Sequence, residues 1–336
     1  MEAFMLQNLF NGGREAQIQA ASEMVKLSSK LRQKLVEGGV ILPLITMLQS
    51  QDYESIQASL FALLTLAFGS ERNKRRMVKS GVVDVLLHLL QWQEESLTEL
   101  TVAALLILSS CGPNKPLIAS SGAIQILVDS IPILTTTQSK LDTLTTLHNL
   151  STCNQAIPQL VSSGLVPTLL QLLTQHSSYP IQPELADKAM ALLEAVAISS
   201  ERAVGQAAVG IRVLVEMVEE GSPQGKEHAV GVLVLICQSS REKYRGLILM
   251  EGAMPGLLQL SIDGSWRARG LAQELLLMLR GDCDGGSRGK KWKQEMVERV
   301  MQEIDAAEGE EEEVFMGSGG SSTLRLVEEM IAKLST

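Results

Sequence analysis

Few side chains in this 336-residue chain have the type and spacing that catalysis or metal binding requires. The four histidines, His88, His148, His176 and His228, are far apart, and no two of the four cysteines form a CxxC pair. A metal site needs several such ligands to converge on one point, and a disulfide framework needs a denser set of cysteines. We therefore expect packing or surface roles for these residues, and we expect no metal and no cofactor.

The run GDCDGGSRGKK, from Gly281 to Lys291, has the composition of a phosphate or calcium loop but not the pattern. A P-loop needs Gly where Asp284 stands and Ser or Thr where Lys291 stands. A calcium loop needs an oxygen ligand where Gly286 stands. No catalytic triad or carboxylate pair has a usable spacing, and Glu194 has no evident partner. The sequence predicts that the protein is not an enzyme.

Charge and hydropathy narrow the function classes further. The formal net charge is −9, and residues 281–336 alone contain 7 Lys/Arg and 13 Asp/Glu. A nearly neutral body with an acidic tail argues against nucleic-acid binding, which depends on neutralising phosphates. The N-terminus has no basic and apolar leader pattern, and no apolar stretch approaches the roughly 20 residues that span a bilayer. We expect no membrane insertion and a cytoplasmic and/or nuclear location.

One basic cluster stands out between residues 72 and 79. Its members are Arg72, Lys74, Arg75, Arg76 and Lys79. It can be a solvated turn, a contact for an acidic segment of a partner, or a nuclear-localisation signal. The candidate contact residues are Lys74, Arg75 and Arg76.

Self-comparison reveals an internal repeat. Six segments align on the anchor positions Gly39, Gly81, Gly122, Gly164, Val209 and Gly252, which are 42, 41, 42, 45 and 43 residues apart. A period near 42 is typical of armadillo or HEAT units of two or three helices. In the fifth segment the glycine, Gly210, falls one place late. The extra residues before it include Pro180 and Pro183, which predict an enlarged loop between two helices of the fourth unit.

Every unit has the same internal order. A short helix ends at the anchor glycine, which can adopt the positive φ that closes a helix. A second helix with paired aliphatic residues follows, and its first turn accepts a proline, as at Pro43, Pro167 and Pro255. A polar turn then leads to a longer third helix whose apolar residues recur at helical spacing. The fold class is all-α, a right-handed superhelix of stacked units.

Three stretches resemble plant U-box/armadillo proteins. They are REAQIQAASEMVKLSSKLRQKLVEGG, EEGSPQGKEHAVGVLVLICQSS and GSWRARGLAQELLLMLR, and they resemble an opening, a late and a closing unit. The resemblance extends over about residues 14–280. It implies a concave surface lined by third helices, and partners such as kinase domains or proteins destined for ubiquitination. Because only about 13 residues, without cysteine, precede the first repeat helix, we expect the partner-binding half of that family without its ligase half.

Armadillo import receptors bind extended basic peptides through Trp and Asn residues on their third helices. The equivalent Asn positions here are Thr65, Ile107, Asn149, Ala195, Leu235 and Met278. Only Asn149 matches, and we expect Trp92, Trp266 and Trp292 to lie outside the third helices. These six residues are hereafter the third-helix row. Either some of its apolar members, Ile107, Ala195, Leu235 and Met278, are buried between units, or the row lines a groove that favours amphipathic helices over basic peptides.

The repeat array is predicted over residues 1–280, as a partial first unit and six units starting near 38, 80, 121, 163, 208 and 251. Residues 281–336 form an acidic tail, with a helix near 290–307, a linker over 308–322 and an amphipathic helix over 323–334. The apolar stripe of that last helix is Leu324, Val327, Ile331 and Leu334. We expect it to dock on the last units or to remain free.

The sequence therefore predicts a non-enzymatic scaffold that binds partner proteins in the groove of an armadillo array. The alternative is a regulatory or competitor subunit of a U-box-type ubiquitin ligase. The oligomeric state is left open.

Overall fold

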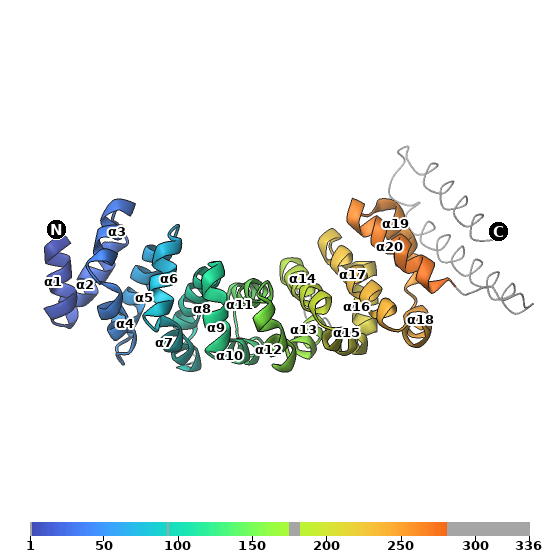
Figure 1. The fold of residues 1–336 in the computed structure, drawn as a ribbon, viewed down its shortest axis with the longest axis horizontal. Helices are drawn as coiled ribbons and strands as arrows, with labels where there is room; N and C mark the ends of the chain where they lie inside the picture. Colours follow the sequence, from blue (N-terminus) through green and yellow to red (C-terminus); the bar gives the residue numbers. More distant parts are fainter. Residues whose placement is uncertain (1, 93, 175–181, 281–336) are drawn as a thin grey trace, which may run out of the picture.

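The computed structural model describes residues 2–92, 94–174 and 182–280. Over these ranges the chain forms one elongated, curved body of helices stacked from α1 to α20 (Figure 1). Six consecutive three-helix units follow a partial unit, within the part of the chain that the structure describes. The predicted all-α solenoid is confirmed.

The partial unit consists of α1 (Glu2–Asn11) and α2 (Arg14–Met24). The first helices of the six units are α3 (Ser29–Glu37), α6 (Glu71–Lys79), α9 (Lys115–Ser120), α12 (Ile157–Ser162), α15 (Glu201–Ala207) and α18 (Arg241–Met250). The second helices are α4 (Ile41–Leu48), α7 (Val82–Leu89), α10 (Ala123–Ser130), α13 (Leu165–Thr174), α16 (Ile211–Glu220) and α19 (Met254–Asp263). The third helices are α5 (Tyr53–Ala67), α8 (Glu95–Ser109), α11 (Thr137–Ser151), α14 (Pro183–Ser199), α17 (Pro223–Ser239) and α20 (Trp266–Leu279). Short 3-10 helices are η1 (Leu90–Trp92), η2 (Gly112–Asn114), η3 (Asn154–Ala156) and η5 (Ala208–Gly210).

The anchor glycines form the joints between first and second helices. Gly81 and Gly122 have φ values of 81° and 82° and directly precede α7 and α10. A side chain is strained in this left-handed region, so the glycine is required by the turn. The predicted starts near 38, 80 and 121 therefore mark this joint, whereas each three-helix unit begins about one helix earlier in the chain.

The fifth joint is built differently. Val209 occupies the anchor, and Gly210 has a φ of −99°, so no left-handed residue is needed there. A Cβ at Gly210 would lie 2.4 Å from Cδ2 of Leu170 on α13. Gly210 is thus kept small by close packing between units, and η5 replaces the glycine turn.

Several third helices begin with a side-chain N-cap, and each third helix buries one side in the core. Asp52, Thr136, Ser222 and Ser265 each accept a hydrogen bond from the backbone N–H three residues on, which caps α5, α11, α17 and α20. Leu147 of α11 is fully buried, as its spacing predicts. Met5 and Leu9 are also buried, so α1, which the sequence did not reveal, covers the N-terminal end of the core.

Candidate functional site

The third helices form one continuous face of the array. Contacts run from α2 to α5 and then through α8, α11, α14 and α17 to α20. In Figure 1, α11 and α14 lie toward the inside of the curve, and α10 and α13 toward the outside. This inner face is where an elongated partner would touch the most units at once.

All six residues of the third-helix row lie at equivalent positions on these adjacent helices, and each is half-buried. Ile107, Leu235 and Met278 pack partly against the core and still reach the surface. Complete burial between units, one of the two predicted alternatives, does not describe them. Their role in binding stays a prediction.

The polar members of the row are already bonded within the array. The Asn149 side-chain amide donates to Ser109 Oγ on α8 at 3.0 Å, and the Thr65 hydroxyl donates to the carbonyl of Phe61 at 2.7 Å. The row therefore offers few side-chain amides to the backbone of an extended peptide.

The placement of the tryptophans corrects one expectation. Trp266 is the first residue of α20 and is 88% exposed, so a third helix does carry a tryptophan. It lies at the opposite end of α20 from Met278. Trp92 lies in η1, outside the third helices, as predicted, and its ring meets the edge of His88 at 6.2 Å between centroids. Trp292 lies outside the described residues.

Glu194 of α14 does have partners, contrary to the sequence prediction. Its carboxylate is buried and lies 2.7 Å from Nδ1 of His228 on α17 and 2.6 Å from a terminal nitrogen of Arg267 on α20. The partners are 34 and 73 residues away in sequence, so no local pattern reveals them. This network ties together the third helices of three consecutive units.

The network continues to Glu227 at the start of α17, which accepts hydrogen bonds from Arg267 at 2.9 Å and from the Ser265 hydroxyl. Burial would raise the pKa of Glu227, but the bonds from Ser265 and Arg267 hold it below its ordinary value. Gly231 leaves room for the buried carboxylate, because a Cβ there would lie 2.0 Å from Oε1 of Glu194.

His148 lies on α11, one unit before this network. Burial lowers its pKa, and the charges of Lys188, His228 and Lys115 lower it further. Its Nδ1 is enclosed and has no hydrogen-bond partner among the described residues. The neutral imidazole is the favoured form.

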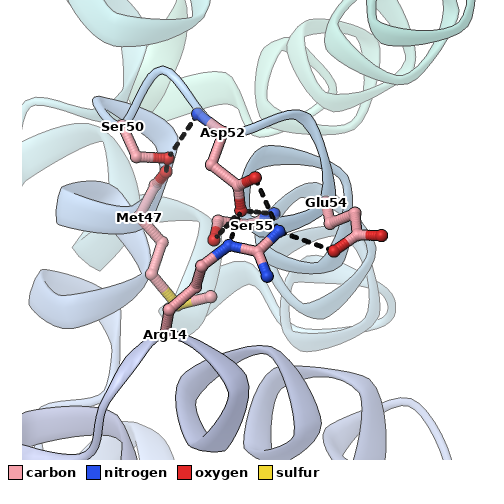
Figure 2. A network of polar contacts seen from close by, with 6 residues as sticks. All are labelled: Arg14, Met47, Ser50, Asp52, Glu54 and Ser55. Carbon is pink, nitrogen blue, oxygen red and sulfur yellow. Dashed lines mark hydrogen bonds and ion pairs between the residues drawn. The ribbon is translucent and has the colours of Figure 1, made fainter.

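At the N-terminal end of the array, the starts of the third helices are clamped to each other. Figure 2 shows the Arg14 guanidinium, at the start of α2, facing the carboxylates of Asp52 and Glu54 at the start of α5. Arg14 binds both oxygens of Asp52 at 2.9 and 2.7 Å, and Glu54 at 2.6 Å. The bonds from Arg14 and Ser55 lower the pKa of Asp52 to about 2. Polar residues about one repeat apart are the sequence signal for such clamps, as for Thr135 and Glu95.

The predicted basic contact separates into buried and exposed residues. Lys74 is buried, and its ammonium donates to Glu71 at 2.7 Å and to Ser110 Oγ, at the end of α8, at 2.8 Å. Lys74 is therefore a structural residue at the C-terminal end of its own third helix, where a cation is favoured. Arg76 is half-buried and donates weakly to the carbonyl of Val36 at 3.4 Å, whereas Arg75 is exposed.

Lys74 follows a rule that its neighbours share. Arg32 of α3 donates to the carbonyl of Thr65 at 2.9 Å, and Lys115 of α9 donates to Thr152 Oγ1 at 2.6 Å. In each case a cation of the first helix holds the end of the third helix in the same unit. In the sequence, the signal for this rule is a cation at about one repeat spacing: Arg32, Lys74 and Lys115.

The remaining predicted residues, Leu324, Val327, Ile331 and Leu334, lie outside the described residues, as do both tail helices and the linker. The first part of the predicted enlarged loop HSSYPIQPELADK, up to residue 181, also lies outside them. Its second half is not a loop, because α14 begins at Pro183. Pro183 begins α14 at a position where its missing N–H costs nothing.

Within the described ranges, no group of three or more His, Cys, Asp or Glu residues is placed to hold a metal ion. In the same ranges no single helix is long and apolar enough to cross a membrane, and two bent helix pairs reach that length and composition only when taken together.

Comparison with solved structures establishes the fold. One is an engineered protein with a TM-score of 0.70 and 20% identity, covering 99% of this chain and 78% of its own. Another is a computationally designed armadillo repeat protein for modular peptide recognition, with a TM-score of 0.62 and 20% identity, covering 70% of this chain and 98% of its own. The fold is that of an armadillo-repeat protein.

Curated proteins confirm the resemblance of this armadillo-repeat chain to plant U-box proteins. It is 31% identical over 175 residues to U-box domain-containing protein 45 of Arabidopsis thaliana, covering 52% of this chain and 22% of that protein. It is 33% identical over 141 residues to U-box domain-containing protein 17 of the same plant, covering 42% of this chain and 19% of that protein. The chain thus spans about a fifth of the length of these relatives. No family model matches it.

Proposed function

We propose that this armadillo-repeat chain is a protein-binding scaffold that holds a helical segment of a partner along its third-helix face. The observation that carries the proposal is the third-helix row: six equivalent, half-buried and mostly apolar positions on adjacent packed helices. Among proteins of similar fold, one design is described as made for peptide recognition and another is in complex with the peptide (KR)4.

The spacing of the row suits a helix. Packed helices lie about 10 Å apart, and a helix rises about 1.5 Å per residue. A ligand helix along the row would therefore present one residue to each unit about every seven residues, which is two turns. An apolar stripe of that period meets the apolar members of the row.

The hydrogen-bonding state of the row argues for the same occupant. An extended peptide exposes its backbone N–H and C=O groups, and leaving these unpaired costs free energy. Asn149, the one amide of the row, already donates to Ser109. A helix forms its backbone hydrogen bonds within itself, so its binding requires only apolar contact from the row.

The likeness to U-box proteins supports a finer proposal. The partner would be a protein that a U-box-type ligase or a signalling kinase also handles, so that this chain presents the partner or competes for it.

Affinity capture with the full chain tests the proposal. Three baits are compared: the native chain, the double variant Ile107→Arg/Ala195→Arg on the third-helix face, and the control Val209→Arg. Val209 is 87% exposed between two helices, so its variant adds the same charged side chain elsewhere. Partners should be lost by the double variant and retained by the control.

Equal capture by all three baits would refute binding at this face. Binding of a basic import-signal peptide at micromolar affinity would refute the preference for helices.

A further inference from the structure

A cleft of about 260 Å³ lies where the end of α5 meets α3 and the start of α6. Its walls include Arg32, Gln33, Thr65, Phe68 and Arg72. A water molecule occupies about 30 Å³ in the liquid, so the cleft has room for a side chain of a bound partner. Thr65 is also the first residue of the third-helix row, and the cleft is therefore continuous with that face.

Two guanidinium groups face the cleft with hydrogen-bond donors to spare. Arg32 uses Nε on the carbonyl of Leu27 at 3.0 Å and one terminal nitrogen on the carbonyl of Thr65 at 2.9 Å. Arg72 uses one terminal nitrogen on Glu37 at 3.2 Å. The other N–H groups of both side chains bond no residue in the described part of the chain.

No Asp or Glu is among the described residues that line the cleft. The electrostatic character around it is also basic. The helix α3 has three Lys or Arg residues and one acid, Glu37, and α6 has five Lys or Arg residues and one acid, Glu71, although the whole chain has a net charge of −9. A planar guanidinium matches a carboxylate with two parallel N–H···O bonds, so an acidic side chain is the complementary ligand.

The rim of the cleft is aromatic. Phe68, which directly follows the last residue of α5, lines the cleft and is 76% exposed. Exposed aromatic side chains beside a charged cleft provide apolar contact for a residue next to the acidic one.

We infer that this cleft binds an acidic segment of a partner protein, with a carboxylate between Arg32 and Arg72 and an apolar neighbour on Phe68. The inference rests on the proposed function, because it supplies an anchor at the Thr65 end of the third-helix row. A polyanion such as RNA or an anionic membrane is disfavoured by the negative charge of the whole chain.

The array contains a natural comparison for this cleft. At the junction of α14 and α15, Ser200 caps α15 as Ser70 caps α6, and Arg202 takes the place of Arg72. Ile198, 63% exposed, stands where Phe68 stands. The counterpart of Arg32 is the buried Ile157, so this junction lacks the second guanidinium.

Fluorescence anisotropy with the full chain tests the inference. The probe is a labelled peptide of about ten residues, rich in Glu around one Phe, and its control has Gln for every Glu. Arg72→Glu should weaken binding of the acidic peptide roughly tenfold or more, since it turns a paired charge into a repulsive one. Phe68→Ser should weaken it less. The matched variants Arg202→Glu and Ile198→Ser should leave it within about twofold.

Three results would overturn the inference: equal losses in the matched variants, equally tight binding of the Gln peptide, or tighter binding of RNA or anionic vesicles with the same loss in Arg72→Glu. The variant Ile107→Arg separates this site from the proposed function. Partner capture that depends on Ile107 without any acidic-peptide binding contradicts the cleft alone. Acidic-peptide binding that depends on Arg72, with capture indifferent to Ile107, contradicts the third-helix proposal alone.

Discussion

The two ends of the third-helix face have the same arrangement of helices but differ in how their polar side chains are bonded. At the N-terminal end, Phe68 is exposed just after α5, in the cleft lined by Arg32 and Arg72, which keep unused donors. At the C-terminal end, Glu194 is buried and its carboxylate is bonded to His228 and Arg267 from the next two units. At one end two guanidinium groups keep N–H groups that bond no described residue, and at the other a buried carboxylate is paired within the array.

This difference shows how a repeat array assigns roles to its units. A buried carboxylate is tolerated only when it is paired and hydrogen-bonded, and here the partners come from successive units. The pairing therefore stabilises the stacking of α14, α17 and α20. Around α5 the ionic clamp of Arg14 with Asp52 and Glu54 lies at the exposed start of the helix, and at its other end Arg32 and Arg72 keep N–H groups that bond no described residue.

The largest expected effect on stability comes from a core substitution in α11, the helix between the two ends of the third-helix face. Leu147 of α11 is fully buried, and α11 packs on both α8 and α14. Leu147→Ala should lower the free energy of unfolding by about 2–5 kcal/mol, as truncation of a core residue does. Because each unit contacts only its neighbours, hydrogen exchange should show opening around α11 before either end. An unchanged denaturation midpoint would contradict the assigned burial.

A smaller loss of stability is expected from a substitution at Gly231, which leaves room for the buried Glu194 carboxylate. Gly231→Ala would improve helix propensity by up to about 1 kcal/mol, yet its Cβ would displace the Glu194 carboxylate from His228 and Arg267. Losing partners of a buried charge costs about 1–3 kcal/mol or more, so we expect net destabilisation of about 1–2 kcal/mol.

The control for this change is Gly246→Ala on α18, where a Cβ meets no atom within 4 Å. That variant should be slightly stabilising by the same helix propensity. Equal melting-temperature shifts for both variants would mean that the network at Glu194 contributes nothing.

The smallest effect concerns the exposed clamp at the N-terminal end. The pKa of Asp52 is lowered to about 2 by bonds from Arg14 and Ser55, whereas an unfolded Asp titrates near 3.9. The folded state therefore binds fewer protons between these values, and the clamp's contribution is present above about pH 4 and lost as pH falls toward 2.

Thermal unfolding at pH 5 and pH 2.5 checks this sign. Asp52→Asn keeps a side chain that caps α5 but does not titrate, so its melting temperature should fall less over that interval than that of the native chain. A larger fall in the variant would contradict the clamp. Because Arg14 and Asp52 are exposed, salt should weaken the difference.

The sequence by itself determined the parts of this protein that depend on local conformation. The period of about 42 residues, the left-handed joints at Gly81 and Gly122, and the burial of Leu147 follow from residue types and helical spacing. These properties need no knowledge of neighbouring units, because steric limits on φ and the 3.6-residue turn act within a few residues.

Only the tertiary structure decided what each surface side chain meets. Lys74 belongs to a basic run, yet stacking turns it inward onto Ser110, 36 residues away. Glu194 looks isolated along its own helix and is paired by Arg267, 73 residues on. The cleft between Arg32 and Arg72 exists only because α3 and α6 belong to consecutive units. Such contacts are set by the direction of side chains between stacked helices, which a spacing in one helix does not contain.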